Sequence, residues 1–501
     1  MKIGDVVREA SMDVLPGFQK PPAGYGNVPF YWWVGDGLTQ ERIGWQMDQL
    51  EACGGITGLQ INYAHGYWDG GGFCGLSMPS DPPLFSEAWW TLVSWTMQEA
   101  KRRGWSLSLS GYTLGPGQGW VFDKVVQETP GMQGAVLRAE RIESPTQGDV
   151  WTLPQTLLSV TAVSANGELA NLTPLCRDGS LRWEGGDSAT TLVVVSVEHP
   201  RFSMNPMHPE SGRRYADAFF GQFERRFPGE AGKGLNFFFS DELDFKVRGW
   251  LWSDDFAAEF LKRKGYDVRP ELALLFVDGN ARAPKIRLDY ADVMVQLSEE
   301  RFFKPVFDWH ETRGMIYGCD HGGRGRDVTE FGDYFRTQRW NQGPGCDQAY
   351  GECNLIKNKV ASSIAHLYLR PRVWLEGFHS TGWGFSSDRL TAMTFRNFAQ
   401  GQNLLSLHGL YYTTHGGFWE WAPPCNHFRM PYWKHSKVFF DMLQRISYLL
   451  AQGHHRCDVA VLYPVASVEG QLNNKDSVTA AFGLGEALYA RQIDFDFMDF
   501  E

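Results

Sequence analysis

The sequence predicts an α/β fold: a (β/α)8 TIM barrel with a β-sandwich-like insertion after strand 3 and the start of a further α/β domain at the C-terminus. Short apolar segments alternate with segments of helical periodicity over most of the 501 residues. The alternation stops between residues 131 and about 200, where short β-rich segments are separated by turns, and then resumes. Apolar strands that alternate with helices favour a parallel sheet covered by helices.

Three strands make up the first part of the predicted barrel. They are expected at 28–36, 57–66 and 105–112, with helices at 39–54 and 86–104 between them. Thr39 is a plausible N-cap of the first helix, which ends at a glycine, and the second helix has a basic last turn.

The strand–helix alternation resumes after the insertion. Four more strands and six helices are expected there: strands at 234–242, 315–322, 372–378 and 403–409, and helices at 212–227, 253–265, 286–314, 354–370, 389–401 and 431–453. This gives seven strands, and the irregular region 327–352 has room for the eighth. Eight is the number that closes a (β/α)8 barrel.

These patterns divide the chain into four parts. Residues 1–130 form the first part of the catalytic barrel, 131–205 a β-rich inserted domain, and 206–455 the remainder of the barrel. Residues 456–501 read as the start of a C-terminal α/β domain that is incomplete, so we expect the chain to be a fragment of a longer protein.

Composition excludes several classes of partner. With 43% hydrophobic and 21% charged residues the chain has the composition of a globular protein, and its net charge of −11 argues against nucleic acid or an anionic membrane as the main partner. No run of about 18 apolar residues occurs, and the acidic start lacks a secretory signal, so a cytoplasmic location is expected. The eight scattered cysteines lack the spacing of a zinc site, and Cys346 and Cys353 are interpreted as free thiols.

Two acidic segments follow apolar strands. The stretch "FFFSDELDF" places Asp241 and Glu242 after three phenylalanines, and "VWLEGF" places Glu376 after another strand. Catalytic groups of such barrels lie where strands end, and two carboxyl groups at one bond are the minimum machinery of most glycosidases. The alternative is that each glutamate forms an ion pair with a nearby arginine, from the set Arg248, Arg324, Arg326 and Arg372.

Other polar and aromatic residues at strand ends are candidate sugar contacts. They are Asp241, Asp320, His321, His65, Trp68, Trp383, His408, Tyr411 and Trp419, with Trp32 and Trp33 as further stacking platforms. Each histidine has the alternative of a loop residue bonded to backbone, and most of the 20 tryptophans have the alternative of core packing. His454 and His455, at a helix end, favour solvation or pairing with the helix dipole over metal binding.

Several stretches together resemble glycoside hydrolase family 106, the α-L-rhamnosidases. They are "FYWWVGDGLTQERIGWQMDQLEACGGITGLQI", "GYTLGPGQGW", "FFFSDELDF", "FAAEFLKRKGYDVRPEL", "ASSIAHLYLRPRVWLEGF" and "QGQNLLSLHG". The resemblance implies an inverting mechanism with Glu242 as general acid and Glu376 as general base. It also implies Ca²⁺ near the sugar hydroxyls, with acids such as Asp241 or Asp320 as ligands, although the sequence assigns no metal ligands.

The functional hypothesis is therefore a glycosidase that cleaves a terminal sugar, α-L-rhamnose first among the candidates, from an oligosaccharide or glycoside. One alternative is a barrel glycosidase of another specificity, such as a retaining β-galactosidase-like enzyme. A second alternative is a carbohydrate-binding barrel without turnover. The sequence predicts no particular oligomeric state.

Overall fold

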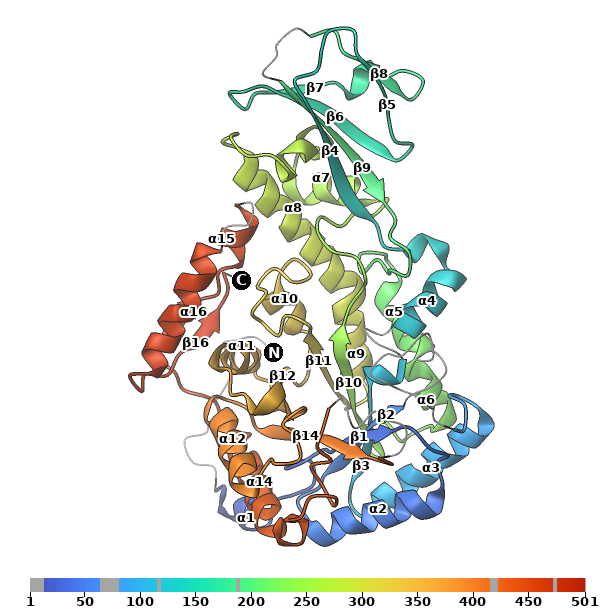
Figure 1. Ribbon diagram of the computed structural model, residues 1–501, viewed down its shortest axis with the longest axis vertical. Helices are drawn as coiled ribbons and strands as arrows, with labels where there is room; N and C mark the ends of the chain where they lie inside the picture. Colours follow the sequence, from blue (N-terminus) through green and yellow to red (C-terminus); the bar gives the residue numbers. More distant parts are fainter. Residues whose placement is uncertain are drawn as a thin grey trace.

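A computed structural model describes residues 13–63, 81–114, 119–185, 190–414, 422–471 and 475–500. Its centre is a sheet of eight parallel strands in the order β11-β10-β3-β2-β1-β14-β13-β12 (Figure 1). The two end strands face each other, and the backbone N–H groups of Gln342 and Gly343 donate to the Tyr317 carbonyl at 3.0 and 3.1 Å just before β12. The sheet is thus a nearly closed parallel barrel.

The strands predicted from the sequence are present, and the eighth lies inside the region that had room for it. The barrel strands are β1 (Phe30–Trp33), β2 (Gly58–Tyr63), β3 (Ser106–Ser110), β10 (Leu235–Leu243), β11 (Ile316–His321), β12 (Gly345–Gln348), β13 (Trp374–Gly377) and β14 (Leu404–Tyr411).

Helices surround the strands. They are α1 (Leu15–Gln19), α2 (Gln40–Cys53), α3 (Glu87–Arg102), α4 (Gly119–Glu128), α5 (Ser211–Ala218), α6 (Phe220–Arg226), α7 (Phe256–Lys264), α8 (Ala283–Ser298), α9 (Lys304–Glu311), α10 (Tyr334–Gln338), α11 (Leu355–Leu367), α12 (Ser387–Ala399) and α14 (Lys437–Leu450). Thr39 caps α2 as predicted, because its side chain accepts a hydrogen bond from the Arg42 N–H.

Several helices differ from the predictions. The helix expected at 212–227 breaks at Phe219 into α5 and α6, and the one expected at 286–314 contains a wider π-helical turn, Glu299–Phe303, between α8 and α9. The sequence reading also missed α4, which precedes the insertion. Helical periodicity alone does not reveal such interruptions, since both halves of each helix keep their apolar face toward the barrel.

The β-rich segment forms two antiparallel sheets. One has the order β4-β9-β6-β7, from β4 (Val136–Glu143), β6 (Leu157–Val163), β7 (Leu169–Asn171) and β9 (Thr191–Glu198). The other pairs β5 (Val150–Thr152) with β8 (Ser180–Arg182). A separate apolar cluster joins the two sheets, with Trp183, Leu181 and Val194 among its members. Figure 1 places this unit beyond α7 and α8, at the far end from α2 and α3.

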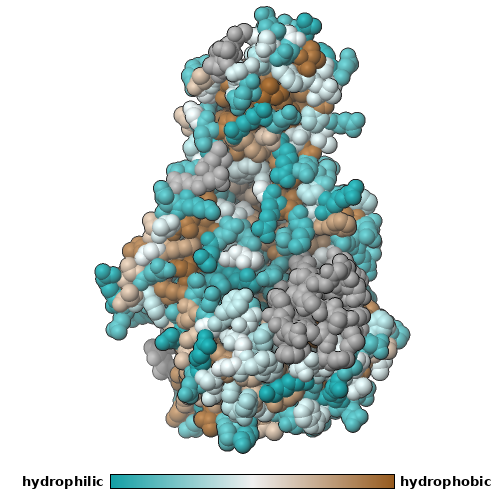
Figure 2. Space-filling model, viewed as in Figure 1, coloured by the Kyte–Doolittle hydropathy of each residue, from teal (hydrophilic) through white to brown (hydrophobic). Residues whose placement is uncertain are grey.

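The last part of the chain packs against α11. It contains β15 (Ala460–Leu462), α15 (Val465–Glu469), α16 (Asp476–Tyr489) and β16 (Asp496–Met498), and β15 pairs with β16 in parallel. Phe495 and Phe497 share an apolar cluster with Val360 and Ile364 of α11. Figure 2 shows apolar side chains gathered on this side of the molecule, where Leu484 and Met498 are exposed.

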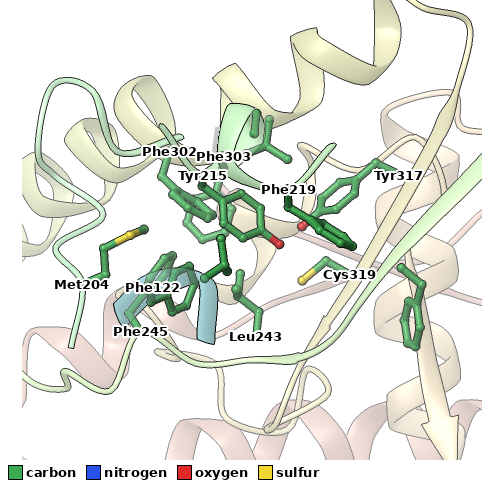
Figure 3. Close-up of a cluster of buried hydrophobic side chains, with 14 of the residues drawn as sticks. Phe122, Met204, Tyr215, Phe219, Leu243, Phe245, Phe302, Phe303, Tyr317 and Cys319 are labelled. Atoms are coloured by element: carbon green, nitrogen blue, oxygen red, sulfur yellow. The ribbon is translucent and has the colours of Figure 1, made fainter. Parts of the chain in front are cut away.

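An aromatic cluster holds β10 against the helices outside the barrel (Figure 3). Tyr317 donates a hydrogen bond to Ser240 Oγ at 2.8 Å, and the Tyr215 hydroxyl lies 3.2 Å from the same atom. Leu243, at the end of β10, belongs to the same apolar cluster. Ser240 and Leu243 therefore both face outward, which fixes the strand on either side of its two acids, Asp241 and Glu242.

All cysteines in the described ranges are free thiols, including Cys346 and Cys353 as predicted. No described helix has the length and apolar character needed to cross a membrane.

Candidate active site

Five carboxyl groups gather at the carboxyl ends of four consecutive barrel strands. They are Asp241 and Glu242 on β10, Asp320 on β11, Asp347 on β12 and Glu376 on β13, each in the last three residues of its strand. β10 and β13 are separated by only β11 and β12 on the ring, so the two glutamates belong to one side of the barrel mouth. The carboxyl ends of barrel strands are where catalytic groups of this fold lie.

Strand alternation points two of these acids into the barrel. Phe239 and Trp374 contact each other with ring centroids 4.2 Å apart, and Asp241 and Glu376 each stand two residues further along the same strands. Residues two apart on a strand share a face, so both carboxyl groups lie above the Phe239–Trp374 contact. Gly345 makes room for the indole, because a Cβ there would lie 2.3 Å from ring atoms of Trp374.

Glu242 is turned by an irregularity in its strand. The register of β10 against β11 shifts between Ser240 and Leu243, and Glu242 has the left-handed φ of 49°. Its N–H donates to Asp320 Oδ1 at 3.0 Å, which supports this uncommon backbone. Bulges of this kind redirect side chains next to active sites.

Arg324 stands between three of the acids. Its Nη2 lies 2.8 Å from Glu242 Oε1 and 3.2 Å from Asp347 Oδ2, and its Nε lies 3.1 Å from Asp320 Oδ2. The ion pair considered as the alternative for Glu242 is thus present. One guanidinium shared by three acids leaves an excess of negative charge in the cluster.

The acids of the cluster differ in how their pKa values are displaced. Burial, together with the charges of Asp347 and Asp320, raises the pKa of Glu376 well above its usual range. Burial, partly offset by Arg324, raises the pKa of Asp320 to about 7, and burial with the charge of Glu376 raises that of Asp241. Burial also tends to raise the pKa of Asp347, but the hydrogen bond from His379 and the charge of Arg324 outweigh it and hold that pKa at about 2.

Glu376 is a buried acid that retains unused hydrogen-bonding capacity. It is 5% exposed, and its Oε2 has no hydrogen-bond partner among the described residues. A buried polar atom without a partner is costly unless a ligand or water satisfies it. This oxygen is therefore a natural contact for a bound water or substrate.

Two exposed aromatic rings lie on the loops that follow β12 and β13. Tyr350 is 63% exposed, with its ring centroid 5.8 Å from that of His379, and His379 Nε2 lies 3.4 Å from Asp347 Oδ2. Trp383, a predicted sugar contact, is 42% exposed. Flat exposed rings of this kind can stack on a sugar.

Other predicted contacts lie in the core. His321 is wholly buried against Phe303, Phe331 and Tyr334, and Tyr411 is buried with its hydroxyl donating to the Ala422 carbonyl at 2.9 Å. The burial of His321 and Tyr411 therefore does not support a direct contact of either side chain with a sugar.

Trp32 and Trp33 are 2% and 0% exposed, so their expected role as stacking platforms is wrong. His408 is also buried and accepts a hydrogen bond from Trp32 Nε1 at 3.0 Å. Its ring packs against that of His379, with centroids 5.5 Å apart. His65, Trp68 and Trp419 lie outside the described residues.

Sequence reasoning missed Asp347, His379 and Tyr350. A signal was available: Gly-Cys-Asp occurs at 318–320, at the end of a predicted strand, and again at 345–347. The structure places these two tripeptides on β11 and β12, with Asp320 and Asp347 both facing Arg324. The repeat would have identified the eighth strand and its acid together.

The cluster fits a divalent cation of the kind that the family resemblance implies. Asp347 Oδ1 and Glu376 Oε2 are buried oxygens without hydrogen-bond partners among the described residues. Asp347, Glu376 and His379 each offer one ligand atom within 4.8 Å of the others. The carboxylate oxygens of Asp347 and Glu376 and the surplus negative charge suit Ca²⁺, which takes oxygen ligands, whereas the His379 imidazole does not.

A parallel barrel with paired acids at its carboxyl end defines the class of barrel glycoside hydrolases. The chain belongs to glycoside hydrolase family 106, because the sequence model of that family, described as alpha-L-rhamnosidase, matches residues 196–500.

Solved structures agree with the fold. A rhamnosidase from Novosphingobium sp. PP1Y matches 98% of this chain with a TM-score of 0.65 and 13% identity. The present chain spans 64% of that chain, and at this identity the likeness shows a shared fold. Isomaltulose synthase from Klebsiella sp. LX3 matches 92% of this chain and 83% of its own, with 11% identity and a TM-score of 0.32, which is too low to indicate a shared fold. No curated protein matches the sequence.

Proposed function

We propose that this chain is a glycosidase that releases a terminal α-L-rhamnose from a glycoside or oligosaccharide with inversion at the anomeric carbon. The observation that carries the proposal is the convergence of Glu242 and Glu376 on one acid cluster at the barrel mouth, within a member of family 106. Glu242 contacts Arg324, Arg324 contacts Asp347, and a ligand atom of Asp347 lies within 4.8 Å of one of Glu376.

The exposure of the two glutamates suits different roles. The Glu242 side chain is 43% exposed and can reach the leaving oxygen of a substrate at the mouth, where it would donate its proton. Glu376, buried and with Oε2 unpartnered, would take a proton from a water that attacks the anomeric carbon. Its raised pKa means that only the ionised fraction of Glu376 would serve as the base. One proton leaves Glu242 and one reaches Glu376, so the products are neutral and the protons redistribute before the next turnover.

Asp347 is the residue that would hold a divalent cation, through its unpartnered Oδ1, and would leave Glu376 Oε2 to the water. Such a cation, when bound, supplies positive charge that offsets the surplus of carboxylates and orients sugar hydroxyls.

A panel of aryl glycosides tests the proposal. We expect turnover of the α-L-rhamnoside, and a fall in kcat of about 10²- to 10⁴-fold in Glu242→Gln and in Glu376→Gln. Glu352→Gln is the matched control, since Glu352 lies beyond β12 and contacts Lys357 at 3.7 Å. Hydrolysis that survives both site substitutions would contradict the assignment.

NMR of the first-formed anomer tests the stereochemistry. Inversion requires the carboxyl groups to be about 6.5–9.5 Å apart, and retention about 5–5.5 Å. A retained anomer from a galactoside would support the other specificity considered above. Saturable sugar binding without product from any glycoside would instead support a binding barrel.

We further propose that the chain divides at residues 130, 205 and 455 into barrel, insertion, barrel and C-terminal parts. The separate apolar clusters of the insertion and of the C-terminal part support this division. Limited proteolysis that cuts first near these positions would bear it out, and early cuts within β10 or β13 would not.

A further inference from the structure

A second group of ionisable side chains lies where the C-terminal part meets α11. His366 of α11 stacks on His455, with ring centroids 3.9 Å apart and an angle of 14° between planes. His366 Nδ1 lies 2.9 and 3.1 Å from the two carboxylate oxygens of Asp496, on β16. His455 Nε2 lies 3.0 Å from Asp494 Oδ2.

The donor atoms are close enough to share an ion. One ligand atom from each of His366, His455 and Asp496 lies within 4.8 Å of the others, and the same holds for His455, Cys457 and Asp494. Ligand atoms bound to one tetrahedral Zn²⁺ at about 2.0–2.3 Å are separated by about 3–4 Å. Small side-chain rotations therefore bring the first three donors to a common centre.

We propose that His366, His455 and Asp496 bind Zn²⁺ or a similar imidazole-preferring divalent ion, with the fourth position open to Asp494 or Cys457. Imidazole, carboxylate and thiolate are the donors that zinc takes in proteins, whereas Ca²⁺ takes oxygen. A bound ion would pin the C-terminal part to α11.

The surroundings supply what a metal site needs. His366, His455 and Asp494 line a cavity of about 840 Å³, whose wall also includes Lys359, Arg370 and Asn403 and which gives an ion a path from solvent. Ser363 Oγ donates a hydrogen bond to Asp496 Oδ1 at 3.2 Å, and this contact orients the carboxylate. The cavity wall includes Gln402 and Asn403, which precede β14, so it lies at the amino ends of the strands, opposite the candidate active site.

The competing explanation is an ion-pair network. Lys359 is 2% exposed at its side chain, and its Nζ lies 2.9 Å from Asp494 Oδ1 and 3.4 Å from Asp496 Oδ1. Those contacts use one oxygen of each carboxylate, and the second oxygen of each faces a histidine. The two explanations differ in what happens when zinc is added.

Titration of the chelator-treated protein with ZnCl₂, followed by calorimetry and thermal unfolding, tests the proposal. We expect one equivalent to bind and the unfolding temperature to rise. His366→Ala and His455→Ala should each weaken binding at least tenfold, while His454→Ala should not, because His454, exposed like its neighbour His455, is outside the donor set. A wild-type protein that takes up no stoichiometric zinc, or binding that persists in both variants, would overturn the proposal.

Two further measurements keep the result unambiguous if a variant folds poorly. Co²⁺ bound to the wild type should give the intense visible absorption of tetrahedral nitrogen and oxygen coordination, and a thiolate charge-transfer band that Cys457→Ser removes would place Cys457 at the fourth position. The acids at the barrel mouth could also take up an ion, so the titration is repeated in Asp347→Asn. Zinc binding that is lost with Asp347 rather than with His366 contradicts the proposal.

Discussion

The two charged clusters of this protein differ in their balance. At the barrel mouth Arg324 contacts three of the five carboxyl groups, and burial and neighbouring charges raise the pKa of Glu376, whereas His379 and Arg324 hold that of Asp347 at about 2. At the C-terminal cluster Asp494 and Asp496 meet Lys359 and two histidines, and despite burial their partners lower both pKa values. The second arrangement is what stability favours, whereas the first holds buried carboxyl groups with displaced pKa values, as is common at functional sites.

The largest effect expected from this contrast is on Glu376. Replacement by Gln should abolish most activity, as proposed above, yet leave the free energy of unfolding unchanged or increased, because burial already disfavours the ionised form of Glu376 and Gln is a neutral side chain of the same shape. Chemical denaturation of the wild type and Glu376→Gln measures this. A large loss of stability would mean that Glu376 holds the barrel together rather than serving catalysis.

Arg324 offers the next largest effect. Arg324→Met removes the cation shared by Glu242, Asp320 and Asp347, and breaking a buried ion cluster from one side typically costs about 3–5 kcal/mol. Arg326→Met is the control, since Arg326 is an exposed residue of the same loop. Equal unfolding free energies for the two variants would show that the acids do not depend on Arg324.

Much of the fold could be predicted because its signals are local. Apolar strands and capped helices repeat in order, and Glu242 and Glu376 stand out because an acid follows each apolar run. Asp347 escaped because β12, Gly-Cys-Asp-Gln, has no run of apolar residues to mark it as a buried strand. Trp32 and Trp33 were misassigned because composition does not tell a core indole from a cleft indole, and the His366–His455–Asp496 cluster was missed because its members come from three remote segments.

The pH dependence of stability sharpens the comparison at Asp320. The pKa of Asp320 is about 7 in the folded protein, against an ordinary value of 3.8. The contribution of this shift to the free energy of unfolding is therefore fully present below pH 3.8 and is lost as the pH rises through about 7. Asp320→Asn stays neutral and can still accept from the Glu242 N–H. We expect the variant to gain stability relative to wild type between pH 4 and pH 8, measured by thermal unfolding in chelator.

A difference between Asp320→Asn and wild type that stays constant over this range, or grows toward acid, would contradict the assignment. The gain in unfolding free energy in Asp320→Asn should be smaller than the loss in Arg324→Met, because the charge of Arg324 offsets part of the cost of ionising the buried Asp320.

The smallest effect is expected at the balanced cluster. Lys359→Met leaves Asp494 and Asp496 with their histidines alone, and the loss of a buried charged donor typically costs about 2 kcal/mol. Lys437→Met is the comparison, because Lys437 pairs with Asp441 on the surface of α14, with its side chain 61% exposed, and such pairs contribute about 0–1 kcal/mol. Both are measured by denaturant unfolding in chelator, so that no metal substitutes for the lysine. If Lys359→Met unfolds no more easily than Lys437→Met, then Lys359 does not stabilise the join between α11 and the C-terminal part, and the balance of charge there is not what holds it.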